Sequence, residues 1–312
     1  MLRLLAVSAL MLLSIPLKAM TSYAADAPTP SAPTQPPAVP TAPAKNPDYA
    51  LSRSKIALPT RSLTYKKVGD RELAMYIFEP AGFKPRDKRP CFVAIHGGGW
   101  VAGTPTIMNC VGEAFAERGW VVANIRYRLH KPEEGTTAFD SVKDAKSAVR
   151  YVRSHAKELG IDPDKIVAGG RSAGGHLAAA TAMFPDLDDE SDDKSVSCVP
   201  NALVLCSPVI DTSSEGYGHE LLGKRWKELS PLHHVRPALP PTIILHGMRD
   251  TTTPFAGAKA FDEAMRAAGN KVKLVAHARG SHSYMMRTKE LFDEAMGQIV
   301  PFLKENGIEG KS

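Results

Sequence analysis

Short apolar runs alternate with longer amphipathic stretches along the chain after residue 60. Six of these runs have the length and composition of buried strands: 91–95, 120–127, 165–169, 202–210, 242–245 and 272–276. The stretches between and after them predict helices near 107–117, 139–159, 173–183, 254–268 and 288–303. Strands that alternate with helices indicate an α/β fold, in which a mostly parallel central sheet is covered by helices on both faces.

Three further segments complete the predicted architecture. Apolar residues recur at three- and four-residue spacing over 139–159, and Gly160 is predicted to end that helix. The runs 62–68 and 73–78 predict an antiparallel hairpin at the start of the sheet. The insertion at 211–240 predicts a small cap. Because ligands of such sheets bind at the carboxyl ends of the strands, the residues that follow each strand are the candidates for a functional site.

Residues 1–24 have the features of a signal peptide. A short basic start is followed by a mostly apolar stretch from Leu4 to Leu17, and Ser22 and Ala24 are small residues at the positions that a signal peptidase reads. The apolar stretch is short for a membrane span, so we expect cleavage after Ala24 and no stable membrane insertion of the mature chain, with an uncleaved anchor as the alternative. Cleavage predicts a secreted or periplasmic protein.

Residues 25–50 have a different composition from the rest of the chain. They contain eight of its 25 prolines, and such a segment buries too little apolar surface to fold. We predict a disordered linker here, either a spacer or a remnant between signal and domain, followed by one folded domain over 51–312. The net charge of +6 is spread along the chain. No basic run or interleaved aromatic stripe predicts nucleic-acid binding.

The first candidate for chemistry is Ser172, in the pentapeptide GRSAG at 170–174 directly after the run 165–169. G-x-S-x-G after a strand predicts a sharp strand-to-helix turn, which presents the serine hydroxyl beside the N-terminus of the next helix. Such a serine is a candidate nucleophile for acyl transfer. The pentapeptide alone also fits a structural turn, so the interpretation depends on the other motifs.

A glycine run follows the predicted strand 91–95, in the segment HGGGW at 96–100. A serine that attacks an ester carbonyl creates an oxyanion, which needs backbone N–H donors that are already in place. We expect the N–H groups of Gly98 and Gly99, together with that of Ala173 beside the nucleophile, to form this oxyanion hole. The flanking residues of the same run are alternative donors.

Two further motifs supply an acid and a base. Asp250 follows the run 242–245 in HGMRDTTTP, and His282 follows the run 272–276 in RGSHSY. We expect His282 to take the proton of Ser172 as a general base and to pass it to the leaving alcohol. Asp250 would orient the imidazole and stabilise its protonated form.

Together HGGGW, GRSAGG, HGMRDTTTP and GSHSY resemble the α/β-hydrolase fold. More narrowly, they resemble the HGGG-type serine esterases, which include the hormone-sensitive-lipase-like group and the acetyl-xylan and feruloyl esterases. The resemblance runs from about residue 62 to about residue 305. It implies a serine carboxylesterase that works through an acyl-enzyme and needs no metal or cofactor. It also implies a small-molecule or plant-polysaccharide ester, acetyl or feruloyl, as substrate, and the short cap favours short acyl chains.

Two other functions share these motifs. An exported serine peptidase or amidase of the same fold would use the same three residues, although such enzymes usually carry an extra domain or a large cap. A non-catalytic hydrolase fold that only binds ligands or partners is the third possibility. A missing triad residue would favour it, and all three residues are present.

Several other residues carry expectations of their own. Trp100, Tyr217 and Trp226 are candidates for the walls of the substrate pocket. Arg171 stands where many HGGG esterases have an acidic residue, and we expect it either in an ion pair under the turn or as a charge near the acyl pocket. The four cysteines of an exported chain leave a disulfide open. The acidic segment 186–193 lacks the ligand spacing of a calcium site and is expected to be a solvated loop.

Overall fold

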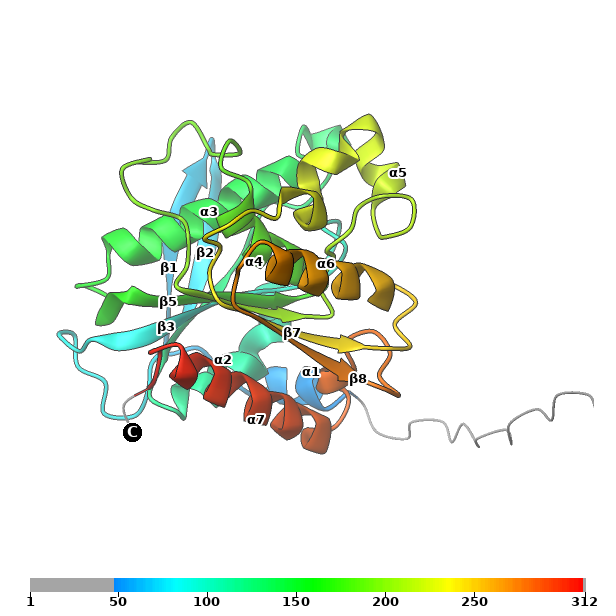
Figure 1. The fold of residues 1–312 in the computed structure, drawn as a ribbon. Helices are drawn as coiled ribbons and strands as arrows, with labels where there is room; N and C mark the ends of the chain where they lie inside the picture. The colour runs from blue at the N-terminus through cyan, green and yellow to red at the C-terminus, as the bar shows by residue number, and fades with distance from the viewer. Residues whose placement is uncertain (1–47, 311–312) are drawn as a thin grey trace, which may run out of the picture. The chain divides into compact units, whose positions relative to one another are not determined.

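Eight strands form one sheet in the order β1-β2-β4-β3-β5-β6-β7-β8 (Figure 1). The computed structural model describes residues 48–310. The strands are β1 (Arg61–Val68), β2 (Arg71–Phe78), β3 (Arg89–Ile95), β4 (Val121–Ile125), β5 (Ile161–Arg171), β6 (Ala202–Cys206), β7 (Thr242–Gly247) and β8 (Val272–His277). β2 runs antiparallel to β1 and β4, and the other neighbours are parallel. The predicted mostly parallel sheet with an antiparallel start is confirmed.

Helices cover both faces of the sheet (Figure 1). One face carries α3 (Ala138–Ser154), α4 (Ala173–Met183) and α6 (Phe255–Ala267), and the other carries α1 (Tyr49–Ser54), α2 (Asn109–Ala116) and α7 (Lys289–Glu305). The small cap between β6 and β7 consists of α5 (His219–Leu222) and the 3₁₀ helices η3 (Gly223–Leu229) and η4 (Pro231–His234). The remaining 3₁₀ helices are η1 (Pro105–Met108), η2 (Pro132–Glu134) and η5 (Tyr284–Met286).

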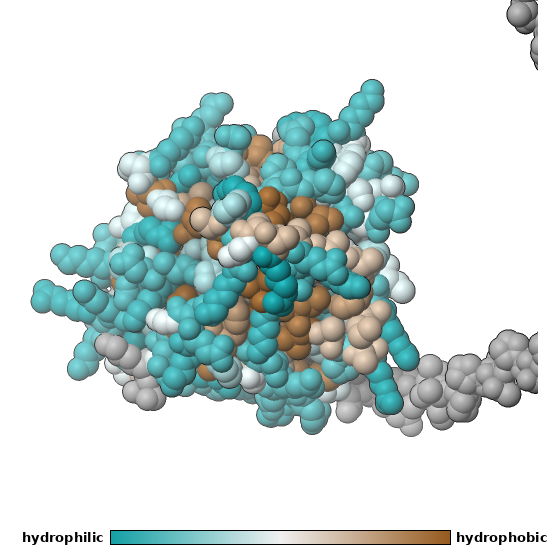
Figure 2. All heavy atoms as spheres, viewed as in Figure 1, coloured by the Kyte–Doolittle hydropathy of each residue, from teal (hydrophilic) through white to brown (hydrophobic). Residues whose placement is uncertain are grey.

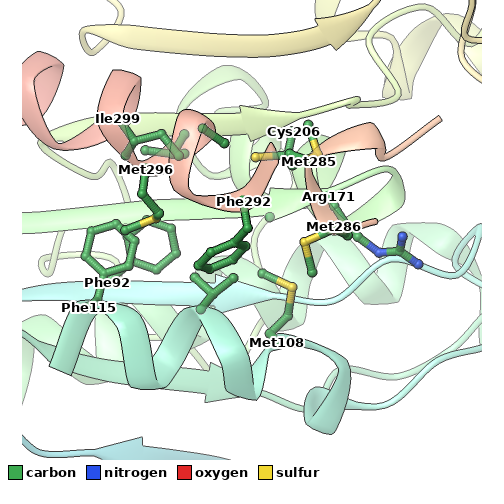
Figure 3. A pocket seen from close by; sticks show the side chains of 14 residues that line it. Phe92, Met108, Phe115, Arg171, Cys206, Met285, Met286, Phe292, Met296 and Ile299 are labelled. Atoms are coloured by element: carbon green, nitrogen blue, oxygen red, sulfur yellow. The ribbon is translucent and has the colours of Figure 1, made fainter. Parts of the chain in front are cut away.

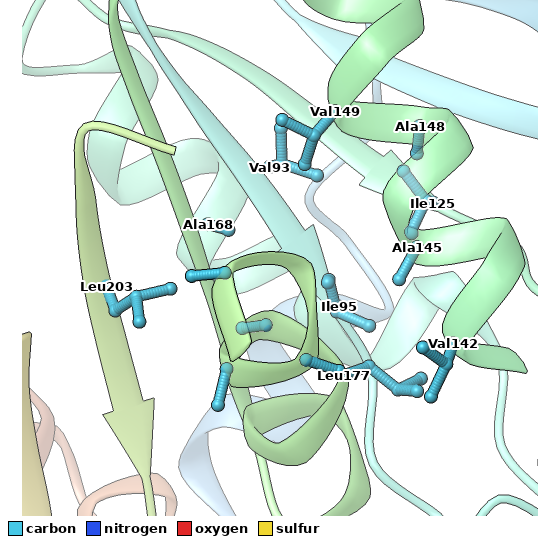
Figure 4. Close-up of a cluster of buried hydrophobic side chains, with 14 of the residues drawn as sticks. Val93, Ile95, Ile125, Val142, Ala145, Ala148, Val149, Ala168, Leu177 and Leu203 are labelled. Atoms are coloured by element: carbon cyan, nitrogen blue, oxygen red, sulfur yellow. The ribbon is translucent and has the colours of Figure 1, made fainter. Parts of the chain in front are cut away.

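The central apolar layer lies between the sheet and the pair α3 and α4 (Figure 4). Ile95 of β3, Ile125 of β4 and Leu177 of α4 are fully buried there. Every residue of α4 is buried, because this helix of alanines and glycines lies between the sheet and α3. Burial of each large aliphatic side chain contributes about 1.5–3 kcal/mol. The layer therefore holds β5, α4 and the turn between them in a fixed position.

The face of the domain seen in Figure 2 is largely hydrophilic. Figure 2 shows hydrophilic side chains around one face, with apolar side chains gathered in its middle over α6 and the adjoining edge of the sheet. Two of the exposed large hydrophobic residues, Val101 and Met248, lie in the loops that follow β3 and β7. Within residues 48–310, none of the helices combines the length and the apolar character that a membrane span requires.

Two elements end earlier than predicted. α3 ends at Ser154, and Gly160, with a φ of 63°, closes the turn into β5 instead of ending the helix. β6 ends at Cys206 and not at residue 210. The reason is that Ser207 has a φ of 40°, which is not a strand conformation, and that Pro208 has no N–H to donate to a neighbouring strand.

The acidic segment 186–193 is a loop in which no residue is buried, as expected, and ion pairs anchor it to the domain. Asp189 lies 2.7 Å from the Nζ atom of Lys66 on β1. Asp188 lies 2.6 Å from the Nζ atom of Lys146 on α3. Both lysines are buried, and a buried ammonium group needs an anionic partner. The segment is therefore tied to the hairpin and to α3.

The folded region includes the last residues of the predicted linker. Helix α1 begins at Tyr49, whose N–H donates to the carbonyl of Arg287 at 3.0 Å and whose ring packs on Phe292 of α7. Residues 25–50 were predicted as one linker, and residues 48–50 belong to the domain. The predicted signal peptide at 1–24 and the rest of the linker lie outside the described residues.

Candidate active site

Ser172 is the single residue between β5 and α4, and its backbone has φ 54° and ψ −124°. The glycines on either side are required by close contacts. A Cβ atom on Gly170 would lie 2.3 Å from the carbonyl oxygen of Ile95, and one on Gly174 would lie 2.1 Å from the same atom. Any larger residue at these positions would therefore collide with the end of β3. The glycines let the turn sit against the strand that carries the predicted oxyanion loop.

Backbone strain gathers around this turn. Among residues 48–310, five residues other than glycine have a positive φ: Trp100, Ser172, Ser207, Ala238 and Ser283. Four of them lie in the loops that follow β3, β5, β6 and β8, at one edge of the sheet. Each such conformation costs of the order of 1–3 kcal/mol and typically persists where function requires it.

Asp250 and His282 meet at the same edge. The Nδ1 atom of His282 lies 2.8 Å from Oδ2 of Asp250, whose side chain is fully buried. The N–H groups of Thr252 and Thr253 each donate to Oδ1 at 2.9 Å. Within residues 48–310, His282 has no hydrogen bond to Ser172. Such contacts often tighten only when substrate binds, and the second ring nitrogen, Nε2, is left for that role.

The carboxyl group of Asp250 is held in its ionised form. Burial by itself would raise the pKa, but the hydrogen bonds from His282 and from the N–H of Thr253, together with the nearby His246 ring, lower it to about 2. The carboxylate is therefore negative at every pH at which His282 could act as a base. This charge favours the protonated imidazole that general-base catalysis creates.

This lowered pKa predicts acid sensitivity of the fold. The pKa of Asp250 lies below its ordinary value of 3.8, so the ionised carboxylate stabilises the folded state above about pH 4 and loses this contribution as the pH falls through about 2. We expect urea unfolding to show a loss of about 2 kcal/mol between pH 5 and pH 2 that the Asp250→Asn variant does not share. Equal acid dependence of the two proteins would contradict it.

The glycine run after β3 passes against Ser172. A Cβ atom on Gly97 would lie 3.2 Å from the Cβ atom of Ser172. Gly98 and Gly99 have φ angles of 128° and 61°, which favour glycine. Within residues 48–310, the N–H groups of Gly98, Gly99 and Ala173 have no hydrogen-bond acceptor. The three predicted oxyanion donors are thus free N–H groups, on the loop beside the serine and at the start of α4.

Gly98→Ala tests this loop. A Cβ atom at Gly98 would lie 2.0 Å from the carbonyl oxygen of Ala102, so the loop must move and its N–H groups lose their direction. We expect kcat for p-nitrophenyl acetate to fall by about 10²-fold, which is typical of a lost oxyanion donor. Gly297→Ala on the exposed side of α7, where no atom lies within 4 Å of the added Cβ, is the control. Equal rates for the two variants would contradict the assignment.

The three predicted pocket residues have different positions. Tyr217 lies over the loop, since a Cβ atom on Gly99 would be 2.3 Å from its hydroxyl oxygen. Trp100 is fully buried, and its ring packs on that of Tyr217 with the centroids 5.7 Å apart. It therefore supports the Tyr217 ring from the interior of the domain. Trp226 is partly buried in the cap, where its ring packs on His233 at 5.0 Å.

A buried histidine joins the loop, α4 and the cap. The Nε1 atom of Trp100 lies 3.3 Å from Nδ1 of His176, and Nε2 of His176 lies 2.7 Å from the carbonyl oxygen of Leu229. Burial lowers the pKa of His176 to about 4, so the ring is neutral. It accepts the indole N–H at Nδ1 and donates from Nε2 to the cap. Trp100 is thereby fixed from two sides.

Arg171 makes no ion pair among residues 48–310, so the expectation of an ion pair under the turn is wrong. It lies at the edge of a small apolar cavity of about 30 Å³ beneath the turn, and its guanidinium group points away from the apolar lining (Figure 3). Cys206 lines the same cavity, and burial raises the pKa of its thiol to about 12. All four cysteines are free, which settles the open question of a disulfide.

Three residues near the pair escaped the sequence analysis. The hydroxyl group of Thr253 donates to Oδ2 of Asp250 at 3.0 Å. The Nε2 atom of His246 lies 2.8 Å from the carbonyl oxygen of Thr253 and 3.5 Å from Asp250. Ser207 contacts the loops of both Asp250 and His282. An aspartate three residues before a threonine is typical of a side-chain-capped turn, a signal that could have identified Thr253. No such pattern marks Ser207.

Comparison with known protein families shows to which family this chain belongs. The BD-FAE family model matches residues 75–265. The chain belongs to the BD-FAE family. Curated relatives of this BD-FAE protein include a probable isoprenylcysteine alpha-carbonyl methylesterase of Arabidopsis thaliana, 30% identical over 62% of this chain and 45% of the relative. A probable carboxylic ester hydrolase of Mycobacterium tuberculosis is 29% identical over 57% of this chain and 45% of the relative. The chain spans about half the length of the curated relatives that it matches.

Solved structures agree with this family. The apo form of Thermogutta terrifontis esterase 2 is 42% identical, with a TM-score of 0.75, and the match covers 81% of this chain and 96% of that chain. The same esterase with propionate bound is 41% identical, with a TM-score of 0.75 over the same shares. The BD-FAE protein is thus an α/β-hydrolase of the serine esterase type. The predicted fold and the predicted class, carboxylic ester hydrolase, are confirmed.

Proposed function

We propose that the protein hydrolyses short-chain carboxylic esters through Ser172, His282 and Asp250. One observation carries the proposal. The buried Asp250 carboxylate holds His282 at 2.8 Å, at the same edge of the sheet as a strained serine and a loop with free N–H groups. This combination supplies a nucleophile, a base with its orienting acid, and donors for an oxyanion.

The reaction follows from these groups. Nε2 of His282 accepts the proton as the Ser172 oxygen attacks the ester carbonyl, and the imidazolium is stabilised by Asp250. The developing oxyanion is bound by the N–H groups of Gly98, Gly99 and Ala173. His282 then protonates the leaving alcohol. Water attacks the acyl-enzyme by the same route and releases the acid.

The cap supports a short acyl group. Tyr217 closes over the oxyanion loop, and the segment between β6 and β7 contributes three short helical pieces and no long apolar lid. Thermogutta terrifontis esterase 2 has been solved with propionate and with butyrate bound. By analogy we propose acetyl to butyryl esters as the preferred substrates.

The natural substrate and the location are further parts of this proposal. Residues 1–24 resemble a signal peptide, so the mature enzyme would act in the periplasm or outside the cell. The motifs resemble those of acetyl-xylan and feruloyl esterases. An acetylated or feruloylated plant polysaccharide is the substrate class that combines both features.

Initial rates on a substrate series test the proposal. The purified chain from residue 25 would be assayed on p-nitrophenyl acetate, butyrate and laurate, and on acetylated xylan and methyl ferulate. We expect kcat/KM to be highest for acetate or butyrate, with turnover of acetylated xylan, of methyl ferulate or of both. A preference for laurate would contradict the short-chain proposal. Turnover of p-nitrophenyl esters alone would contradict only the polysaccharide part.

A further inference from the structure

Ser207 lies where the three loops of the candidate site meet. It follows β6, between β5 and β7 in the sheet, and it is fully buried. Its hydroxyl oxygen accepts a hydrogen bond from the N–H of Ser283 at 3.1 Å. Its carbonyl oxygen lies 3.3 Å from the hydroxyl of Thr253, which also binds Asp250. One residue therefore contacts both the loop of the acid and the loop of the base.

The preceding residue extends this junction to the nucleophile. The N–H of Ser172 donates to the carbonyl oxygen of Cys206 at 3.0 Å, and the N–H of Ser207 donates to the carbonyl oxygen of Leu245 on β7 at 2.8 Å. The Cys206–Ser207 pair is thus bonded to the turn of Ser172, to β7 and to the loop of His282, and it contacts the loop of Asp250. Because β6 is a central strand with a fixed position, residues at its end hold the three loops in fixed positions relative to one another.

The loop of His282 is also held at Gly280, whose carbonyl oxygen accepts the N–H of Arg249 at 2.8 Å, and at the His282 ring by Asp250, but the bond to Ser207 is the one that holds the backbone of Ser283. Among residues 48–310, the backbone hydrogen bonds of residues 281–283 otherwise run to the adjoining turn of η5. Ser283 is buried and has a φ of 55°. Without the Ser207 hydroxyl, its N–H would have no partner, and this strained conformation would lose its support. The ring of His282, one residue away, would then lose its fixed direction.

We propose that Ser207 is a positioning residue whose hydroxyl holds the N–H of Ser283, and thereby places the His282 ring between Asp250 and Ser172. The proposal rests on the proposed function of these three residues. Ser207 touches no reacting atom. It acts before substrate binds, by keeping the distance between base and nucleophile constant. A displacement of about 1 Å at such a site can cost 10²-fold in rate.

Ser207→Ala tests this role, because it removes the hydroxyl and leaves the backbone contacts. We expect kcat for p-nitrophenyl acetate to fall about tenfold, with KM within about twofold of wild type. Active sites would be counted by stoichiometric reaction with paraoxon, so that kcat refers to folded, reactive enzyme. Ser141→Ala is the matched control. Ser141 lies on α3 and is also fully buried, and its hydroxyl donates to the carbonyl oxygen of Arg128 at 2.6 Å.

Ser207→Gly separates the hydroxyl from the backbone strain. Glycine lacks the same hydroxyl but accepts the φ of 40° without strain, so it should fold at least as well as the alanine variant. Equal losses of kcat in the two variants support the proposal. A kcat within about twofold of the Ser141→Ala control in both variants would overturn it. If Ser172→Ala keeps the wild-type rate, the proposed function itself fails, whatever the Ser207 variants show.

Discussion

Ser172→Ala is expected to lower kcat for p-nitrophenyl acetate by about 10⁵-fold, the largest effect of any single substitution in this protein. Alanine removes the attacking oxygen, so no acyl-enzyme forms, and only the oxyanion donors and substrate binding contribute to the remaining rate. The strained φ of 54° at this position is common to both residues. The change is therefore confined to the chemistry, and the melting temperature should change by only a few degrees.

The measurement combines rates with covalent labelling. Thermogutta terrifontis esterase 2 has been solved after phosphorylation by paraoxon, which makes the same reagent a suitable probe here. We expect one equivalent of paraoxon to modify the wild-type chain and none to modify the Ser172→Ala variant, as read by intact-mass spectrometry. Wild-type turnover by the variant would disprove the mechanism. Labelling at a different residue would place the nucleophile elsewhere.

Asp250→Asn is expected to lower kcat by about 10⁴-fold while the fold persists. The asparagine oxygen can still accept the N–H bonds of Thr252 and Thr253, which now run to Oδ1 at 2.9 Å. The amide lacks the negative charge that stabilises the imidazolium. An amide NH₂ facing Nδ1 of His282 would also favour the wrong tautomer, with the proton on Nε2.

The pH dependence of kcat/KM distinguishes this effect from simple unfolding. Loss of the adjacent negative charge removes the stabilisation of the imidazolium that general-base catalysis creates. We therefore expect kcat/KM of the Asp250→Asn variant to lie below the wild-type value at every pH at which both proteins are folded. Asp293→Asn, which changes an exposed carboxylate paired with Lys289 on α7, is the control. An unchanged kcat in Asp250→Asn would contradict the assigned role.

Local features of the sequence were sufficient to predict the fold and the positions of the candidate site residues. The apolar runs and the helical spacing predicted the parallel sheet and its two helical layers. The motifs around Ser172, Asp250 and His282 each follow a strand, and parallel strands bring such loops to one edge. These inferences succeed because glycine conformation, side-chain period and strand direction act within a few residues.

The arrangement that holds these residues in place was decided by the tertiary structure. The hydroxyl of Ser207 meets the N–H of Ser283 across 76 positions of the chain, and Asp189 meets Lys66 across 123 positions. Trp100 is buried and Arg171 has no ion pair among residues 48–310. Short-range sequence patterns do not predict such pairs, because the two residues come within hydrogen-bonding distance only in the folded sheet. The sequence therefore determined which residues form the candidate site, and the packing of distant loops on β6 determined what fixes their positions.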